Sequence, residues 1–174
     1  MKILISCCVS VFAVWLMLPI GIVGSTNMTH TCESWQGLVG GQEKPVQTPS
    51  NIDLDNEAEV FEGIECLLKL EGNKSHGTPS GATHMAVSDI LPSAAVEVSA
   101  LHYISYLYYK RFDYANGVAL VLSGDGSNDF NSQEAISLAY KSYREWFVKI
   151  KETGLKEARE KKIDPLEGSA VKWY

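Results

Sequence analysis

The chain has 174 residues, of which 45% are hydrophobic, and its 21 acidic and 15 basic side chains give a formal net charge of −6. This composition is too apolar for an intrinsically disordered protein, and the length is too short for a multi-domain enzyme. The acidic balance argues against a nucleic acid as partner, because binding to phosphates requires a basic excess.

The first 25 residues have the pattern of a targeting segment. Lys2 supplies the only early charge, and residues 3–23 are almost continuously apolar, with the helix breakers Pro19 and Gly21 near their end. A charged start, an apolar stretch and small residues after it are typical of a secretory signal peptide. We therefore predict a cleaved signal peptide over residues 1–25.

Two other interpretations of this segment stay open. Residues 3–23 are long enough to remain as a membrane anchor, although Pro19 and Gly21 favour cleavage. A lipoprotein signal ending at Cys7 is disfavoured, because no apolar stretch precedes that cysteine. We expect an exported protein, periplasmic or secreted, with no stable membrane association after cleavage.

Cleavage leaves Cys32 and Cys66 as the cysteines of the mature chain. An oxidising compartment favours a disulfide bond between them, and their single possible pairing leaves no choice of partner. Such a bridge closes a loop of about 35 residues and stabilises the fold by about 3–4 kcal/mol in the chain-entropy model. We expect it to tie an irregular lead-in, residues 26–50, to the first helix of the mature chain.

Apolar periodicity predicts helices in the rest of the chain. The first starts after a cap at Asp55 or Asn56 and ends near Leu70, before Gly72. The second covers about residues 94–114, and its wide apolar arc predicts a central position.

The clearest helix starts after Asn131, which precedes Glu134 by three positions as in a capping box. Gly154 interrupts it, and a short helix over 155–162 is expected to follow. Two large aromatic residues end the chain, and we expect Trp173 to dock onto the body of the protein.

The apolar run 117–123 fits either a buried strand or a helical turn. A strand there has no evident partner in the sequence. We therefore predict an all-α fold, a compact single-domain bundle of about four helices over residues 51–174, after the signal peptide and the irregular lead-in.

A glycine-rich stretch over residues 71–84 is the most site-like part of the sequence. Its polar side chains Lys74, Ser75, His76 and His84 are candidates for binding a small anionic or polar ligand. An ordinary surface connection explains the same residues. The two histidines need a third ligand for a metal ion, which the sequence does not identify, so we expect no metal and no cofactor.

A second candidate is a partner surface on the second predicted helix. A helical wheel gathers His102, Tyr106 and Tyr109 into one narrow strip, and rings with polar tips are favoured at interfaces. The alternative is a helix margin with no binding role. Glu97 falls on the apolar side of the same helix, and its burial would mark a functional site.

Charge is unevenly distributed along the mature chain. Residues 53–65 contain six acidic side chains and no basic one, whereas residues 141–162 contain eight basic and four acidic ones. Two helix faces that attract one another within the fold explain this pattern. The alternative is a charged surface that steers a partner.

The sequence contains no recognisable enzyme motif. We expect an exported helical protein that acts by binding a protein partner or a small polar ligand. The alternative is a small hydrolase in which His76 or His84 acts together with Glu97 or Ser75. The sequence says nothing about oligomeric state.

Overall fold

The computed structural model describes residues 30–40, 52–77, 95–111, 119–124 and 129–174. These residues are mostly helical, which confirms the all-α class, although they contain five helices where about four were expected. The signal peptide predicted over 1–25 lies outside the described residues. No helix among those that the structure describes is long and apolar enough to cross a bilayer. The elements are α1 (Cys32–Gly37), α2 (Glu57–Leu68), α4 (Val96–Tyr109), β1 (Leu120–Leu122), α5 (Gln133–Thr153), α6 (Leu155–Glu160) and β2 (Val171–Trp173).

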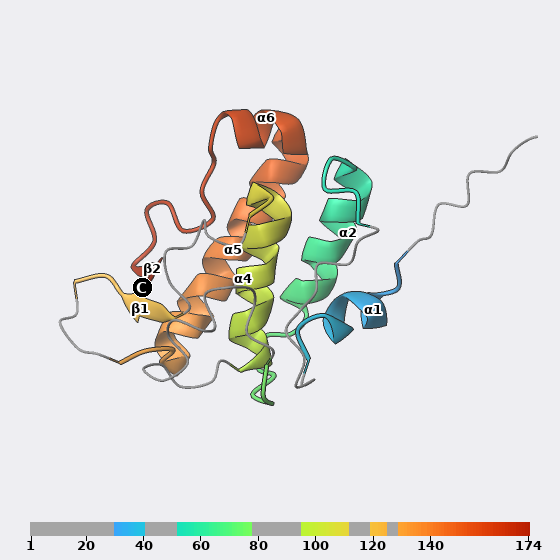
Figure 1. Cartoon of the computed structure of the whole chain (residues 1–174). Coiled ribbons are helices and arrows are strands. Elements are labelled where there is room, and N and C mark those ends of the chain that lie inside the picture. The colour runs from blue at the N-terminus through green and yellow to red at the C-terminus, as the bar shows by residue number, and fades with distance from the viewer. Residues whose placement is uncertain (1–29, 41–51, 78–94, 112–118, 125–128) are drawn as a thin grey trace, which may run out of the picture.

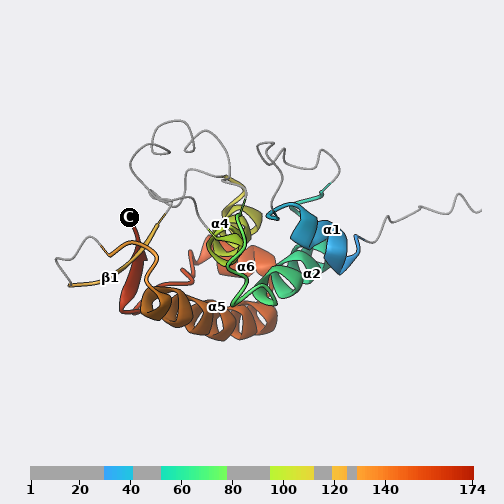
Figure 2. The same ribbon diagram turned by 90° about the horizontal axis from the view of Figure 1, so that it is seen from below.

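Helix α4 occupies the middle of the molecule, as its apolar arc predicted. It lies between α2 and the long helix α5, while α6 lies near the ends of both α4 and α5 (Figure 1). Seen from below, α1 and α2 are on one side of α4 and the small sheet is on the other (Figure 2). Because neighbours surround α4, every residue from Val96 to Tyr108 is buried.

The lead-in is not wholly irregular, because it contains the short helix α1. The Thr31 side chain caps this helix by accepting a hydrogen bond from the Ser34 N–H at 3.3 Å. The predicted disulfide is present and joins Cys32 to Cys66, with 5.3 Å between their Cα atoms. The bridge therefore links α1 to α2, as expected.

Burial of Trp35 also holds α1 against α2. Trp35 is 1% exposed and lies against Gly63 of α2. A Cβ atom at Gly63 would come within 3.0 Å of the Trp35 ring and of Leu107 Cδ1. The absence of a side chain at this position lets the two helices approach closely.

Helix α2 has the predicted limits. Asn56 is its N-cap and accepts a hydrogen bond from the Glu59 N–H at 3.3 Å. The chain turns away after the helix, and Gly72 adopts a φ of +82°, a conformation that glycine tolerates without strain.

Helix α4 is shorter than the predicted range 94–114. It ends at Tyr109 because Lys110 adopts a left-handed φ of 62°, and the Lys110 N–H bonds back to the Tyr106 carbonyl. Arg159 of α6 closes this end by donating to the carbonyls of Leu107 and Tyr108, at 2.8 and 2.7 Å. The left-handed Lys110 therefore ends α4, and Arg159 satisfies two of the carbonyls that this end leaves open.

The cap of α5 is Ser132, one residue after the predicted Asn131. The Ser132 side chain accepts from the Ala135 N–H at 3.2 Å. Asn131 has a φ of 56° and binds the backbone of Leu120 instead. Gly154, with a φ of +86°, separates α5 from α6, as predicted.

The apolar run 117–123, whose sequence fits either a strand or a helical turn, contains the strand β1. It pairs antiparallel with β2 at the chain end, in a register that places Leu120 opposite Trp173 and Leu122 opposite Val171. The expectation that a strand here has no partner was therefore wrong. The partner lies about 50 residues later in the chain, too far for a local pattern to reveal it.

Candidate functional site

The loop after α2 holds the first group of predicted ligand residues. Lys74, Ser75 and His76 are exposed, and His84 lies outside the described residues. The Ser75 backbone N–H and Oγ both bond to Asn73 Oδ1, at 3.1 and 2.5 Å. The loop is thus held in a turn by its own side chains.

The carbonyls of this loop cap helix α4. The Val96 N–H donates to the Ser75 carbonyl at 2.9 Å, and the Glu97 N–H donates to the Asn73 carbonyl at 3.1 Å. These two amides would otherwise be available to an anion at the helix N-terminus. The described part of the loop therefore serves as a helix cap, and nothing in it favours the predicted ligand site.

Glu97 is buried, with 1% of its surface exposed, which is the condition that would mark a site. Its Oε2 accepts a hydrogen bond from the Gly72 N–H at 2.7 Å, so the carboxylate anchors the same loop. Among the described residues, no hydrogen bond or ion pair joins a histidine to Glu97 or Ser75. The ion pair that involves a histidine there is His30 Nε2 with Glu59 Oε1, at 3.2 Å. The pairing required for a hydrolase is therefore not assembled in the described structure.

The predicted partner strip on α4 faces the interior. His102 is 4% exposed and Tyr106 is 7% exposed, while Tyr109 is half-buried and donates to Asp164 Oδ2 at 3.1 Å. The helical wheel correctly predicted that these residues share one face of α4, but neighbouring elements cover that face. The prediction that they form an exposed surface was wrong for His102 and Tyr106.

His102 has a structural role beside the C-terminal strand. Its ring makes an edge contact with Trp173, with 5.6 Å between the centroids. Burial disfavours the charged imidazolium and lowers the pKa of His102 to about 4. The side chain is therefore neutral near pH 7.

The acidic and basic segments attract one another within the fold. Arg159 of α6 lies 3.9 Å from Asp55, and Lys151 of α5 lies 3.9 Å from Glu65 of α2. Arg144 of α5 also pairs with Glu71, just after the acidic segment, at 2.5 Å. The basic excess of residues 141–162 is thereby partly neutralised by acidic side chains of α2 and of the turns on either side of it. This observation supports the intramolecular interpretation of the charge pattern over a steering surface.

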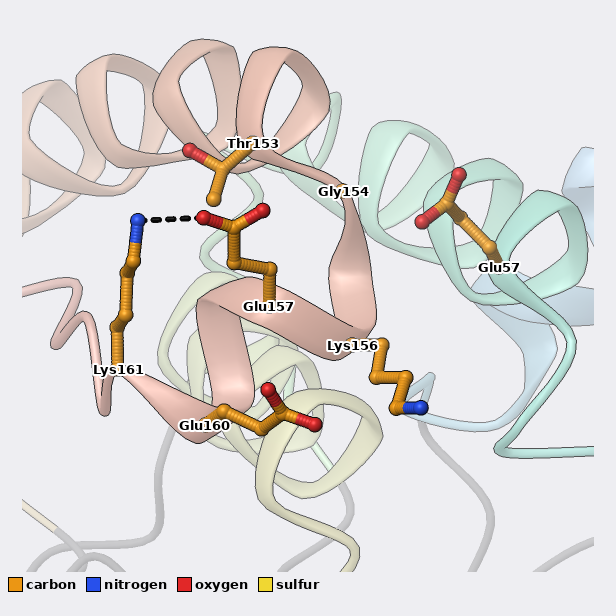
Figure 3. Close-up of a pocket in the computed structure, with 7 residues that line it drawn as sticks. All are labelled: Glu57, Thr153, Gly154, Lys156, Glu157, Glu160 and Lys161. Carbon is orange, nitrogen blue, oxygen red and sulfur yellow. Dashed lines mark ion pairs between the residues drawn. The ribbon is translucent and has the colours of Figure 1, made fainter.

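An open hollow of about 520 Å³ lies where α5 meets α6, beside the start of α2 (Figure 3). Several of its polar groups already have partners: Glu57 Oε2 accepts from the Leu155 N–H at 2.5 Å, and Glu157 pairs with Lys161 at 2.5 Å. No group of acidic, histidine or cysteine residues in the described ranges is arranged to hold a metal ion. We therefore assign no ligand to this hollow, whose lining residues are Glu57, Thr153, Gly154, Lys156, Glu157, Glu160 and Lys161.

The surface with the strongest binding character lies at the small sheet. Tyr174 is 61% exposed, and its ring contacts that of Phe130 with 4.9 Å between centroids. Trp173, the residue before Tyr174, is half-buried, and Lys172 is exposed. We call these four residues the C-terminal aromatic surface.

This surface is held in place by the body of the protein. The Tyr174 N–H donates to the Ala119 carbonyl at 2.8 Å, and Trp173 Nε1 donates to the Tyr143 hydroxyl at 3.1 Å. The predicted docking of Trp173 is therefore confirmed. The pairing of Tyr174 with Phe130 was not predicted, because the only signal for it in the sequence is the presence of aromatic residues at both positions.

No protein-family model matches the chain, and neither a curated protein nor a solved structure matches it.

Proposed function

We propose that the mature chain is an exported protein-binding module that meets its partner through the C-terminal aromatic surface. The observation that carries this proposal is Tyr174, which is largely exposed yet pinned by its backbone hydrogen bond to Ala119. Aromatic side chains dominate the energetics of protein interfaces. Because the backbone at Tyr174 is fixed and its ring already contacts Phe130, less conformational entropy is lost when a partner covers the ring.

Clustering supports the same proposal. Single exposed apolar residues are normal on soluble proteins, whereas the exposed ring of Tyr174 packs against the half-buried ring of Phe130. Export places the C-terminal aromatic surface where it can meet a protein of the same compartment. The hydrolase alternative has no contact in the described residues that favours it.

The proposal is tested by site-specific photo-cross-linking of the protein in its native cells. Benzoylphenylalanine is introduced at Tyr174 and, as a matched control, at Val148, which is 59% exposed on α5. We expect a discrete adduct with a second protein from position 174 and none from position 148. The absence of an adduct at 174, or the same adducts from both positions, would refute the proposal.

A second measurement uses the partner that the cross-link identifies. Replacing Tyr174 with alanine removes the exposed ring and should weaken binding by about tenfold or more, as expected for an aromatic hot spot. Val148→Ala should leave the affinity unchanged. Equal effects of the two substitutions would show that the aromatic surface is not the binding site.

A further inference from the structure

Strand β2 has one edge that faces away from β1. Two hydrogen bonds flank the paired strands: the Tyr174 N–H donates to Ala119 at 2.8 Å, and the Ser123 N–H donates to Ala170 at 2.7 Å. Because paired and unpaired residues alternate in an antiparallel ladder, Lys172 bonds to β1. Val171 and Trp173 therefore direct their backbone groups to the opposite side.

The outward groups of both strands are only partly satisfied within the described residues, and on β1 no hydrogen bond there uses the backbone groups of Leu122. Also on β1, Asn131 satisfies both outward backbone groups of Leu120. The Asn131 Oδ1 accepts from the Leu120 N–H, and the Asn131 N–H donates to the Leu120 carbonyl, both at 2.8 Å. On β2, the Val171 N–H donates to Ser169 Oγ at 3.1 Å. No hydrogen bond of the described residues uses the Val171 carbonyl or either backbone group of Trp173. The edge of β2 is thus a template for another strand.

Lys172 determines which kind of strand fits this edge. It lies at the centre of β2, is exposed, and forms no ion pair within the part of the chain that the structure describes. A second copy of β2 paired about this position would place two ammonium groups opposite each other, which is unfavourable. An acidic side chain at the facing position would instead complement the charge.

We propose that a segment of a partner protein adds to β2 as a third, antiparallel strand, with an acidic residue facing Lys172 and with Tyr174 covered by a neighbouring apolar side chain. This inference rests on the proposed function and specifies the chemistry of its partner. Backbone hydrogen bonds to Val171 and Trp173 provide the docking, and the side chains that alternate along the added strand provide selectivity.

The test uses two variants of the mature protein and a random twelve-residue peptide display library as probe. Semisynthesis can methylate the backbone nitrogen of Trp173, which removes an outward donor without changing the bonds between β1 and β2. Lys172→Glu reverses the charge, and Lys149→Glu makes the same change at an exposed position on α5 as the control.

Peptides selected on the unmodified protein should contain an aspartate or glutamate flanked by apolar residues at alternate positions. They should bind the methylated protein and the Lys172→Glu variant at least about tenfold more weakly, while Lys149→Glu should leave binding unchanged. Binding should also slow hydrogen exchange at the Trp173 amide. Far-ultraviolet circular dichroism of each variant confirms that the fold is retained.

Three results would overturn strand addition: no selected peptide, selected peptides that bind the methylated protein equally well, or enrichment without acidic residues. A dimer that methylation abolishes would assign the edge to a second copy instead. Cross-linking at Tyr174 is measured independently, so a protein adduct there together with failed strand addition would leave the proposed function standing and refute only the binding mode.

Discussion

Removing the guanidinium of Arg159 tests how the C-terminal end of α4 is held. This side chain is 17% exposed, and it donates to the carbonyls of Leu107 and Tyr108 and, at 2.8 Å, to that of Leu54. The carbonyls in the last turn of a helix lack intrahelical partners, so two of these bonds satisfy groups that α4 leaves open. The third connects the same side chain to the segment before α2.

The expected loss follows from these three contacts. A hydrogen bond to a charged group contributes about 1.5–3 kcal/mol, and bonds made by one group are not additive. Replacing Arg159 with methionine keeps the apolar stem and should lower the free energy of unfolding by about 3–4 kcal/mol. For a domain of about 150 residues, this corresponds to a melting temperature lower by about 10 °C. Arg159→Lys keeps the charge but cannot reach all three carbonyls, so it should lose about half as much.

The assay is urea unfolding of the disulfide-bonded mature protein, followed by circular dichroism and tryptophan fluorescence. Lys156→Met on the same helix is the control, because Lys156 is exposed, and it should change the free energy of unfolding by less than about 0.5 kcal/mol. If Arg159→Met falls within about 1 kcal/mol of the unmodified protein, the carbonyls do not depend on Arg159 and the reasoning is wrong.

Three further predictions concern stability. Gly77→Ala should destabilise the fold by about 1–3 kcal/mol, because a Cβ there would lie 2.4 Å from Ser99 Oγ and 2.9 Å from the Ala95 carbonyl group. Replacing both Cys32 and Cys66 with serine should cost about 3–4 kcal/mol through the regained freedom of the unfolded chain. Since the folded-state pKa of His102 is about 4 and its unfolded value is 6.5, the unfolded chain takes up the proton first as pH falls. Urea unfolding should therefore show about 2–3 kcal/mol of stability lost between pH 6.5 and 4.5, a loss that His102→Gln removes.

Each of these predictions has its own control. Gly37→Ala should be nearly neutral, because no atom lies within 4 Å of a Cβ built there, and equal effects at both glycines would contradict the steric argument. If the variant with serine at both positions is as stable as the disulfide-bonded protein, the bridge contributes nothing to the free energy of unfolding. If the His102→Gln variant loses as much stability with falling pH as the unmodified protein, other groups cause the loss.

The features that were predicted correctly from the sequence depend on residues close together in the chain or on composition alone. Helices α2 and α5 were predicted because their apolar residues recur at helical spacing, and caps such as Asn56 act on amides within three residues. The disulfide between Cys32 and Cys66 followed from counting cysteines in the mature chain, which required no knowledge of the fold.

Non-local contacts decided the rest. The angular positions of His102 and Tyr106 on α4 were correct, but a wheel cannot show how many elements surround a helix. Two carbonyls at the C-terminal end of α4 are satisfied by Arg159, which lies about 50 residues later in the chain.

The candidate site depends in the same way on contacts between distant segments. The sequence by itself determined the helical class and the cysteine pair, whereas the exported compartment stays a prediction. Only the tertiary structure decided that β1 pairs with β2 and that Tyr174 lies beside Phe130. The physical reason is that hydrogen bonding within a helix is satisfied by neighbours in sequence, whereas a strand takes its partner from wherever the fold brings one.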